Sequence, residues 1–204
     1  MKGFTVGFYS MFNRGEWDME RPILEPLGAK AILADEKSEK ELLDMAGEID
    51  ALLIANNNLT AEHIRKMKKC RIIGRQGVGM DSIDLEAARE AGIVVCNVPD
   101  CSQEEVADHA TAMMLTVGRN IPFYNHLIKV EKIWDHRSLP VMKKVTEMKV
   151  FLVGFGKIGQ LVAEKIVPLF GEVLAYDPFM NGDAARALGV KVVDSLEEGL
   201  KIAD

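Results

Sequence analysis

The stretch KVFLVGFGKIGQLVAEKIVPLFGEVLAYDPF, residues 149–179, carries the signal that decides the fold of the second half of the chain. Its apolar run VFLV leads into three glycines in the pattern G-x-G-x-x-G, at Gly154, Gly156 and Gly159, and a helical pattern follows. A strand before the glycines and a helix after them separate a dinucleotide-binding turn from an accidental match. In such a turn Gly154 permits the tight bend, Gly156 lets a pyrophosphate approach the backbone, and Gly159 lets the helix pack close to the strand.

The second strand of this stretch ends at Asp177. An acid at that position accepts hydrogen bonds from ribose hydroxyls and repels a 2′-phosphate, so the sequence predicts NAD(H) rather than NADP(H). The pyrophosphate is expected over the N–H groups at the helix N-terminus, with Lys157 adding positive charge. A methyltransferase that binds an adenosyl sulfonium ligand can also use a glycine-rich first turn and a later acid. The complete G-x-G-x-x-G disfavours that alternative.

Upstream of the glycines, five short β-rich runs alternate with helical patterns. Many of the strands are apolar on both faces, as in a parallel sheet that helices cover on both sides. The expected strands are residues 4–10, 30–35, 50–56, 71–76 and 93–99, and the expected helices are residues 18–27, 39–47, 61–69 and 84–91. This alternation predicts a doubly wound α/β lobe of the flavodoxin-like type, with a parallel sheet.

A longer helical pattern over residues 102–120 changes the rhythm, and Ser102 and Glu105 have the spacing of a capping box. We place a domain junction near residue 100, between a lobe of residues 1–100 and a domain of residues 101–204. The second domain is expected to hold interdomain helices and an incomplete Rossmann NAD-binding domain. Its expected strands are 148–153, 172–177 and 190–193, and its helices are 156–170, which Pro168 should kink or end, 182–188 and 195–203.

The composition limits the classes of function. The 204 residues carry a net charge of −6 without a basic stripe, which argues against a nucleic-acid partner. No apolar run approaches the roughly 20 residues that span a bilayer, and the N-terminus is a poor signal peptide. The three cysteines, without C-x-x-C spacing, indicate reduced thiols and predict a cytoplasmic location. No metal-binding constellation is apparent.

Four stretches make the chain recognisable. They are GRQGVGMDSIDLEAAREAGIVVCNVPD (74–100), EEVADHATAMMLTVGRN (104–120), WDHR (134–137) and the glycine-rich stretch itself. In this order they resemble the D-isomer-specific 2-hydroxyacid dehydrogenases, and the chain looks closest to the branch with the C-terminal-binding-protein-like members. The resemblance covers essentially the whole chain. It implies two α/β lobes, with NAD on one lobe and a small 2-hydroxy or 2-oxo acid between them.

The resemblance also assigns roles to residues at strand ends. It implies that the N–H groups of Val78 and Gly79 hold the substrate carboxylate, which is chemically sensible because donors in a turn form an anion nest. Arg75 would make the electrostatic potential there more positive, and the alternative is an ordinary surface arginine. Asn56 to Asn58 either contact substrate or form a plain turn. The implied cofactor set is Gly154, Phe155, Gly156, Lys157, Ile158, Gly159, Asp177, Pro178 and, near the nicotinamide, Val106.

In the family that the chain resembles, an arginine, a glutamate and a histidine act in hydride transfer, and all three lie past the position that matches Asp204. Structural roles are favoured for the chain's own histidines, which are His63, His109, His126 and His136. We therefore expect an NAD-dependent 2-hydroxyacid dehydrogenase by family, of which this chain is a truncated, catalytically incomplete and inactive fragment. The alternative is a non-enzymatic NAD(H)-sensing interaction module of the corepressor type. In the full-length context the resemblance implies a homodimer, with residues 104–147 in the contact.

Overall fold

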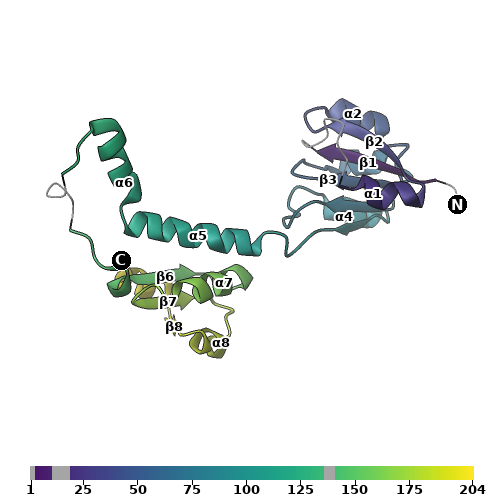
Figure 1. Cartoon of the computed structure of the whole chain (residues 1–204). Helices are drawn as coiled ribbons and strands as arrows, with labels where there is room; N and C mark the ends of the chain where they lie inside the picture. Colours follow the sequence, from purple (N-terminus) through teal and green to yellow (C-terminus); the bar gives the residue numbers. More distant parts are fainter. Residues whose placement is uncertain (1–2, 11–18, 136–140) are drawn as a thin grey trace. The chain divides into compact units, whose positions relative to one another are not determined.

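The computed structural model describes residues 3–10, 19–135 and 141–204. The chain divides into two compact units, Met1–Cys101 and Ser102–Asp204, and each is described by itself (Figure 1). The last two residues of the WDHR stretch, among them His136, lie outside the described residues.

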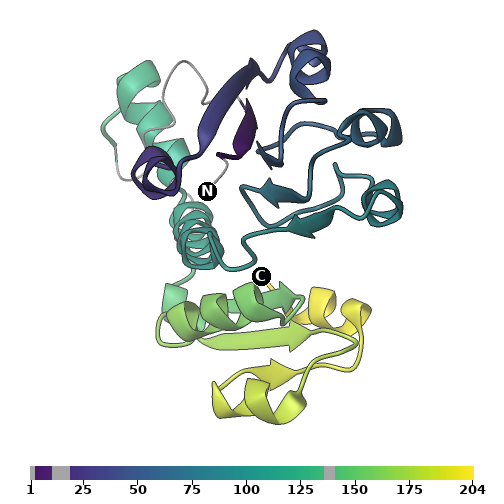
Figure 2. The same cartoon turned by 90° about the vertical axis from the view of Figure 1, so that its right-hand side faces the viewer.

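The first unit is built on a five-stranded parallel sheet in the order β2-β1-β3-β4-β5. Its helix α1 lies on one face of the sheet, and α2, α3 and α4 lie on the other (Figure 2). The order 2-1-3-4-5 is that of flavodoxin-like sheets, which confirms the expected fold class. The strands are β1 (Thr5–Ser10), β2 (Lys30–Asp35), β3 (Ala51–Ile54), β4 (Ile72–Arg75) and β5 (Val94–Cys96), and the helices are α1 (Arg21–Leu24), the 3-10 turn η1 (Glu25–Leu27), α2 (Glu39–Met45), α3 (Ala61–Lys66) and α4 (Leu85–Glu90).

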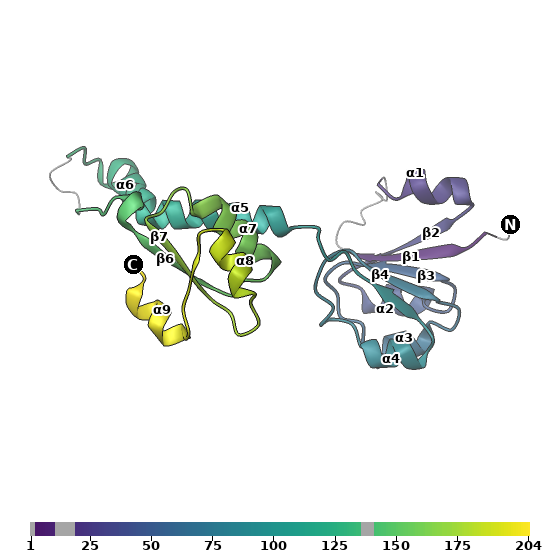
Figure 3. The ribbon, with the colours of Figure 1, turned by 90° about the horizontal axis from the view of Figure 1, so that it is seen from below.

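The second unit holds a parallel sheet in the order β6-β7-β8. This is the order of the first half of a Rossmann domain, in which successive strands are added on one side. Helices α7 and α9 lie on opposite sides of the strands (Figure 3). The elements are α5 (Gln103–Gly118), α6 (Ile121–His126), the π-helical turn η2 (Leu127–Glu131), the 3-10 turn η4 (Val145–Glu147), β6 (Lys149–Val153), α7 (Lys157–Ile166), β7 (Glu172–Tyr176), α8 (Gly182–Ala187), β8 (Lys191–Val192) and α9 (Leu196–Ile202).

Two local expectations need correction. The expected capping box at Ser102 is not formed: Ser102 is the N-cap of α5, with φ −148° and ψ 20°, and among the described residues no side-chain hydrogen bond caps the helix. Helix α7 ends at Ile166 rather than near residue 170. Pro168 has no N–H to donate to the preceding turn, and Leu169 and Phe170 instead fold back onto the Ile166 carbonyl.

Each unit has its own apolar core. In the first, fully buried side chains from the helices and strands meet on one face of the sheet, among them Leu42, Leu52, Ile54, Ile64 and Ile73. In the second, α7 and β7 contribute Val162, Ile166 and Val173, and Ala107 of α5 belongs to the same cluster. Lys165 of α7 also bonds Glu104 and Asp108 of α5, at 2.8 and 2.9 Å. These contacts hold α5 against α7, next to the glycine-rich turn.

Candidate functional site

The three glycines of the turn after β6 differ in what their geometry requires. Gly154 has φ +97°, a conformation that side chains with a β-carbon rarely adopt. A β-carbon at Gly159 would lie 2.5 Å from the carbonyl oxygen of Gly154, so the start of α7 can approach the end of β6 only without a side chain there. A β-carbon at Gly156 would meet nothing within 4 Å. The position of the second glycine, Gly156, is therefore open for a ligand, which is what a pyrophosphate site needs.

Phe155 anchors this turn in the domain core. Its side chain is 3% exposed and packs in the cluster that contains Val162 and Ile166. Helix α7 then begins at Lys157 with Gly156 as its N-cap, and the cap makes no side-chain hydrogen bond within the described part of the chain. The first N–H groups of a helix have no partner inside the helix. The turn therefore presents backbone donors and the positive end of the helix dipole to an anion.

Asp177 lies at the end of β7, beside the turn. One carboxylate oxygen accepts the Phe155 N–H at 2.8 Å, and the other accepts the Phe179 N–H at 2.8 Å. These two bonds lower the pKa of the Asp177 carboxyl, that from Phe155 most. An ionised carboxylate has about four acceptor positions, so ribose hydroxyls can still bind.

The remaining predicted cofactor residues lie at the surface of the same unit. Lys157 and Ile158 are exposed in the first turn of α7, and Pro178 is exposed directly after Asp177. Val106 is exposed in the first turn of α5, while its neighbour Ala107 packs in the cluster that contains Phe155. The structure thus brings the glycine-rich turn, Asp177 and the start of α5 to one end of the second unit.

The predicted substrate residues lie at the carboxyl ends of β3 and β4 in the first unit. The Arg75 guanidinium donates to Asn56 Oδ1 at 2.9 Å and lies over Gly77, where a β-carbon would be 2.5 Å from Nη1. Arg75 is therefore a half-buried, oriented cation rather than a free surface arginine.

The turn after β4 is held from its other side by the residues that follow β5. Asn97 Nδ2 donates to the Val78 carbonyl at 2.7 Å, and the Val98 N–H donates to the Gly77 carbonyl at 3.0 Å. Among the backbone hydrogen bonds of turns and loops in the described residues, none is donated by the N–H of Val78 or of Gly79. Val78 and Gly79 are both exposed residues, and N–H donors beside an oriented cation can bind a carboxylate.

Among the described histidines, His63 and His126 make side-chain contacts within their own units. His63, which the sequence alone associates with a basic surface run, is buried. Its Nδ1 accepts the Thr60 N–H at 3.2 Å, and its Nε2 lies 2.8 Å from Glu39 Oε1. His126 bonds exposed Glu131, and His109 is exposed on α5. The spacing of Thr60 and His63, three residues apart at a helix start, is the signal that could have identified the buried histidine.

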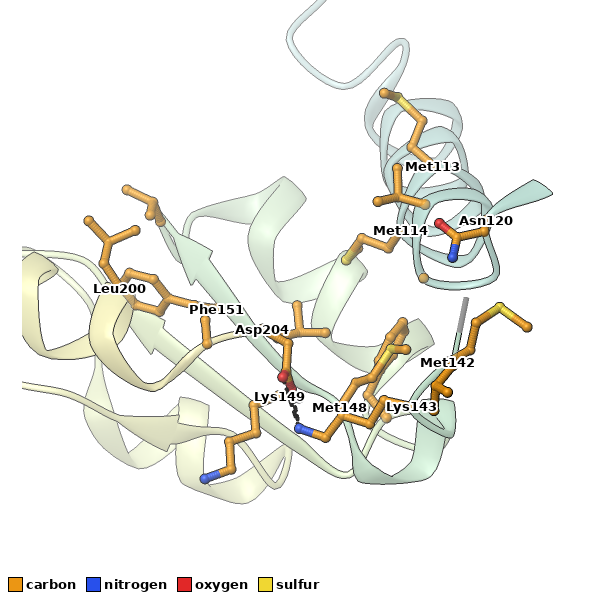
Figure 4. A pocket seen from close by; sticks show the side chains of 17 residues that line it. Met113, Met114, Asn120, Met142, Lys143, Met148, Lys149, Phe151, Leu200 and Asp204 are labelled. Atoms are coloured by element: carbon orange, nitrogen blue, oxygen red, sulfur yellow. Dashed lines mark hydrogen bonds and ion pairs between the residues drawn. The ribbon is translucent and has the colours of Figure 1, made fainter. Parts of the chain in front are cut away.

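A hollow of about 700 Å³ lies elsewhere on the second unit, along the free edge of β6 (Figure 4). Its walls come from α5, β6 and α9 and are mostly apolar, with Met113, Met114, Phe151 and Leu200 among the lining residues. The ion pair between Lys143 and Asp204, at 2.7 Å, lies at this hollow. None of the predicted cofactor residues lines it.

Over the described residues, no helix combines the length and the apolar character needed to cross a bilayer. The same residues contain no cluster of three or more His, Cys, Asp or Glu side chains placed to hold a metal ion.

Comparisons with known proteins place these features in a family context. Residues 17–202 match the family described as D-isomer specific 2-hydroxyacid dehydrogenase, catalytic domain. The D-3-phosphoglycerate dehydrogenase of Methanocaldococcus jannaschii is 34% identical over 183 residues, which cover 89% of this chain and 34% of that protein. The D-3-phosphoglycerate dehydrogenase of Synechocystis is 37% identical over 158 residues, which cover 77% of this chain and 28% of that protein. The chain thus spans about a third of the length of these curated relatives.

Among solved structures, the D-lactate dehydrogenase of Aquifex aeolicus, in complex with NAD and lactic acid, matches with a TM-score of 0.79. The match has 27% sequence identity and covers 98% of this chain and 58% of that one.

Proposed function

This chain belongs to the D-isomer specific 2-hydroxyacid dehydrogenase family, and from that premise we propose that it binds NAD(H) through its Ser102–Asp204 unit. We propose further that the protein transfers a hydride between NAD(H) and a small 2-hydroxy or 2-oxo acid. The observation that carries the proposal is the turn after β6, in which Gly156 leaves open space beside the uncapped start of α7 and Asp177 borders the turn.

In this proposal the chain's own residues bind and orient. The donors at the start of α7 hold the pyrophosphate, with Lys157 adding charge and Ile158 and Val106 contributing apolar surface. Asp177 accepts the adenosine ribose hydroxyls and, by charge repulsion, excludes a 2′-phosphate. NAD, when bound, supplies or accepts the hydride.

We assign the substrate carboxylate to the turn after β4. The N–H groups of Val78 and Gly79 would donate to its oxygens, and Arg75, held by Asn56, would add a fixed positive charge. The carboxylate is the group that all 2-hydroxy and 2-oxo acids share, so this turn would recognise the class. The side chain of the particular acid would be selected elsewhere.

We also propose a homodimer formed through α5, α6 and η2, and a cytoplasmic location. Large apolar side chains remain exposed along these elements, which supports a protein contact there: Met113, Val117, Ile121, Phe123, Ile128 and Val130. The three cysteines carry no disulfide, which supports a reducing compartment.

Calorimetric titration of the 204-residue chain with NADH and with NADPH tests the binding proposal. We expect saturable NADH binding and weaker NADPH binding, and Asp177→Ala should reduce the difference between them. Equal affinity for both cofactors in the wild-type chain would contradict the role of Asp177. Sizing with and without NADH separates the alternative, an NAD(H)-sensing module, because only that function requires the association state to change with NADH.

A further inference from the structure

The backbone of Phe155 is held by side chains on both of its polar groups. Its N–H donates to Asp177 Oδ2 at 2.8 Å, and its carbonyl accepts from Gln160 Nε2 at 3.1 Å. Asp177 comes from the end of β7, whereas Gln160 comes from the first turns of α7. The residue between the first two glycines is therefore fixed by an acceptor from one element and a donor from another.

This arrangement matters because the turn is otherwise permissive. Gly154 and Gly156 flank Phe155, and glycine loses more backbone freedom on ordering than any other residue. The backbone N–H of Gln160 donates to the carbonyl of Gly156, the N-cap of α7, at 3.0 Å. The side chain of the same residue donates to the carbonyl of Phe155, so Gln160 bonds two consecutive residues of the turn.

We propose that Gln160 is a positioning residue for the pyrophosphate: its carboxamide holds the glycine-rich turn in the conformation that presents the α7 donors. This inference rests on the proposed NAD(H) site and adds a residue that the G-x-G-x-x-G pattern does not include. Gln160 itself contacts no part of the ligand in this role. Asp177 has two roles in this proposal, because it holds the turn and also binds the ribose hydroxyls.

The two holding side chains are consequently distinguishable by the ligand they affect. Loss of the Gln160 donor should weaken ligands that contain the pyrophosphate and leave adenosine unaffected. Loss of the Asp177 carboxylate should weaken both kinds of ligand. A side chain with only a general role in stability would change all ligands together or none.

The test uses Gln160→Met, which keeps the length of the side chain but removes the donor. The control is Glu164→Met, which places the same side chain one turn further along the exposed face of α7. Affinities of the full 204-residue chain for NADH and ADP-ribose are measured by calorimetry, and adenosine by displacement of NADH. We expect Gln160→Met to weaken NADH and ADP-ribose roughly threefold to tenfold, the effect of one net hydrogen bond. Adenosine affinity and the control should stay near wild type.

Amide hydrogen exchange without ligand supplies a second readout, since Gln160→Met should speed exchange at the glycine-rich turn and the control should not. Unchanged NADH and ADP-ribose affinities in Gln160→Met would overturn the inference, as would an equal loss of adenosine affinity. If the wild-type chain failed to bind NADH at all, the proposed function would fail and this inference with it. NADH binding that is insensitive to Gln160→Met would overturn the inference alone.

Discussion

Gly159 lies so close to Gly154 that a β-carbon at residue 159 would stand 2.5 Å from the Gly154 carbonyl oxygen. The neighbouring atom is backbone and cannot move aside as a side-chain end can. We expect Gly159→Ala to lower the free energy of unfolding by about 1–3 kcal/mol, the usual cost of overpacking. NADH affinity should fall as well, because α7 must move away from β6. Urea unfolding and calorimetry measure the two effects.

Gly156→Ala is the matched substitution in the same turn. A β-carbon at residue 156 would meet nothing within 4 Å, and the backbone there has a negative φ of −73°. Stability should be unchanged or raised by about 0.4–1 kcal/mol, because alanine restricts the unfolded chain. The methyl group would occupy the space into which the pyrophosphate fits, so NADH affinity should fall roughly tenfold, or 1.4 kcal/mol. Wild-type NADH affinity in Gly156→Ala would contradict the placement of the pyrophosphate beside Gly156.

The Asp177 carboxyl predicts a dependence of stability on pH. Its pKa is lowered in the folded chain by the hydrogen bonds from Phe155 and Phe179. The stabilisation is then fully present above the unfolded value, about 3.9, and is lost as the pH falls through the lower folded value. The difference in melting temperature between wild type and Asp177→Asn should be constant from about pH 8 to pH 5 and shrink below about pH 4. A difference that already shrinks near neutral pH would assign the effect to another group.

Much of the fold follows from local pattern, and the departures have physical reasons. The alternation of apolar runs and helical periods predicts parallel sheets, because strands joined by helices are typically apolar on both faces, and both units have such sheets. Strands β3, β4, β5, β7 and β8 end earlier than their expected runs, whereas β1, β2 and β6 end where expected. The run over residues 93–99 forms a strand only at Val94–Cys96, and the side chain of the next residue, Asn97, donates to the Val78 carbonyl. Pro168 and Ser102 illustrate the same limit, since backbone geometry decides whether a helix continues or a cap forms.

Some residues of the candidate site can be predicted from the sequence, and others cannot. The glycine spacing and Asp177 are readable because each position has one steric or electrostatic requirement. Gln160 and the pairing of Arg75 with Asn56 are not readable, because they depend on where two elements bring side chains that are distant in sequence or turned back on the chain. His63 lies between these cases. Its spacing from Thr60 carries a signal, but its burial and its contact with Glu39 come from the packing of α2 beside α3.

Gly77 offers a contrast to Gly159. A β-carbon at residue 77 would lie 2.5 Å from Arg75 Nη1, which is the end of a flexible side chain. The guanidinium can move away, so Gly77→Ala should change the free energy of unfolding by less than about 1 kcal/mol. The movement should break the bond to Asn56 and weaken the binding of a 2-oxo acid such as pyruvate in the presence of NADH. Calorimetry with pyruvate checks this, with Asn56→Ala as a second way to release Arg75. If both variants bind pyruvate as the wild type does, Arg75 has no part in substrate binding.

The environments of His63 and His126 predict that substitution by alanine lowers the free energy of unfolding at His63 and leaves it nearly unchanged at His126. The His63 side chain is 9% exposed, accepts the Thr60 N–H and contacts Glu39, whereas the His126 side chain is 57% exposed and has one surface partner, Glu131. His63→Ala removes the acceptor for the Thr60 N–H and leaves a gap at the start of α3. We expect a loss of about 1–3 kcal/mol in the free energy of unfolding. His126→Ala should change it by less than about 0.5 kcal/mol, as expected of a surface pair. Urea unfolding at pH 7.5 measures both, and equal effects of the two substitutions would contradict the structural role of His63.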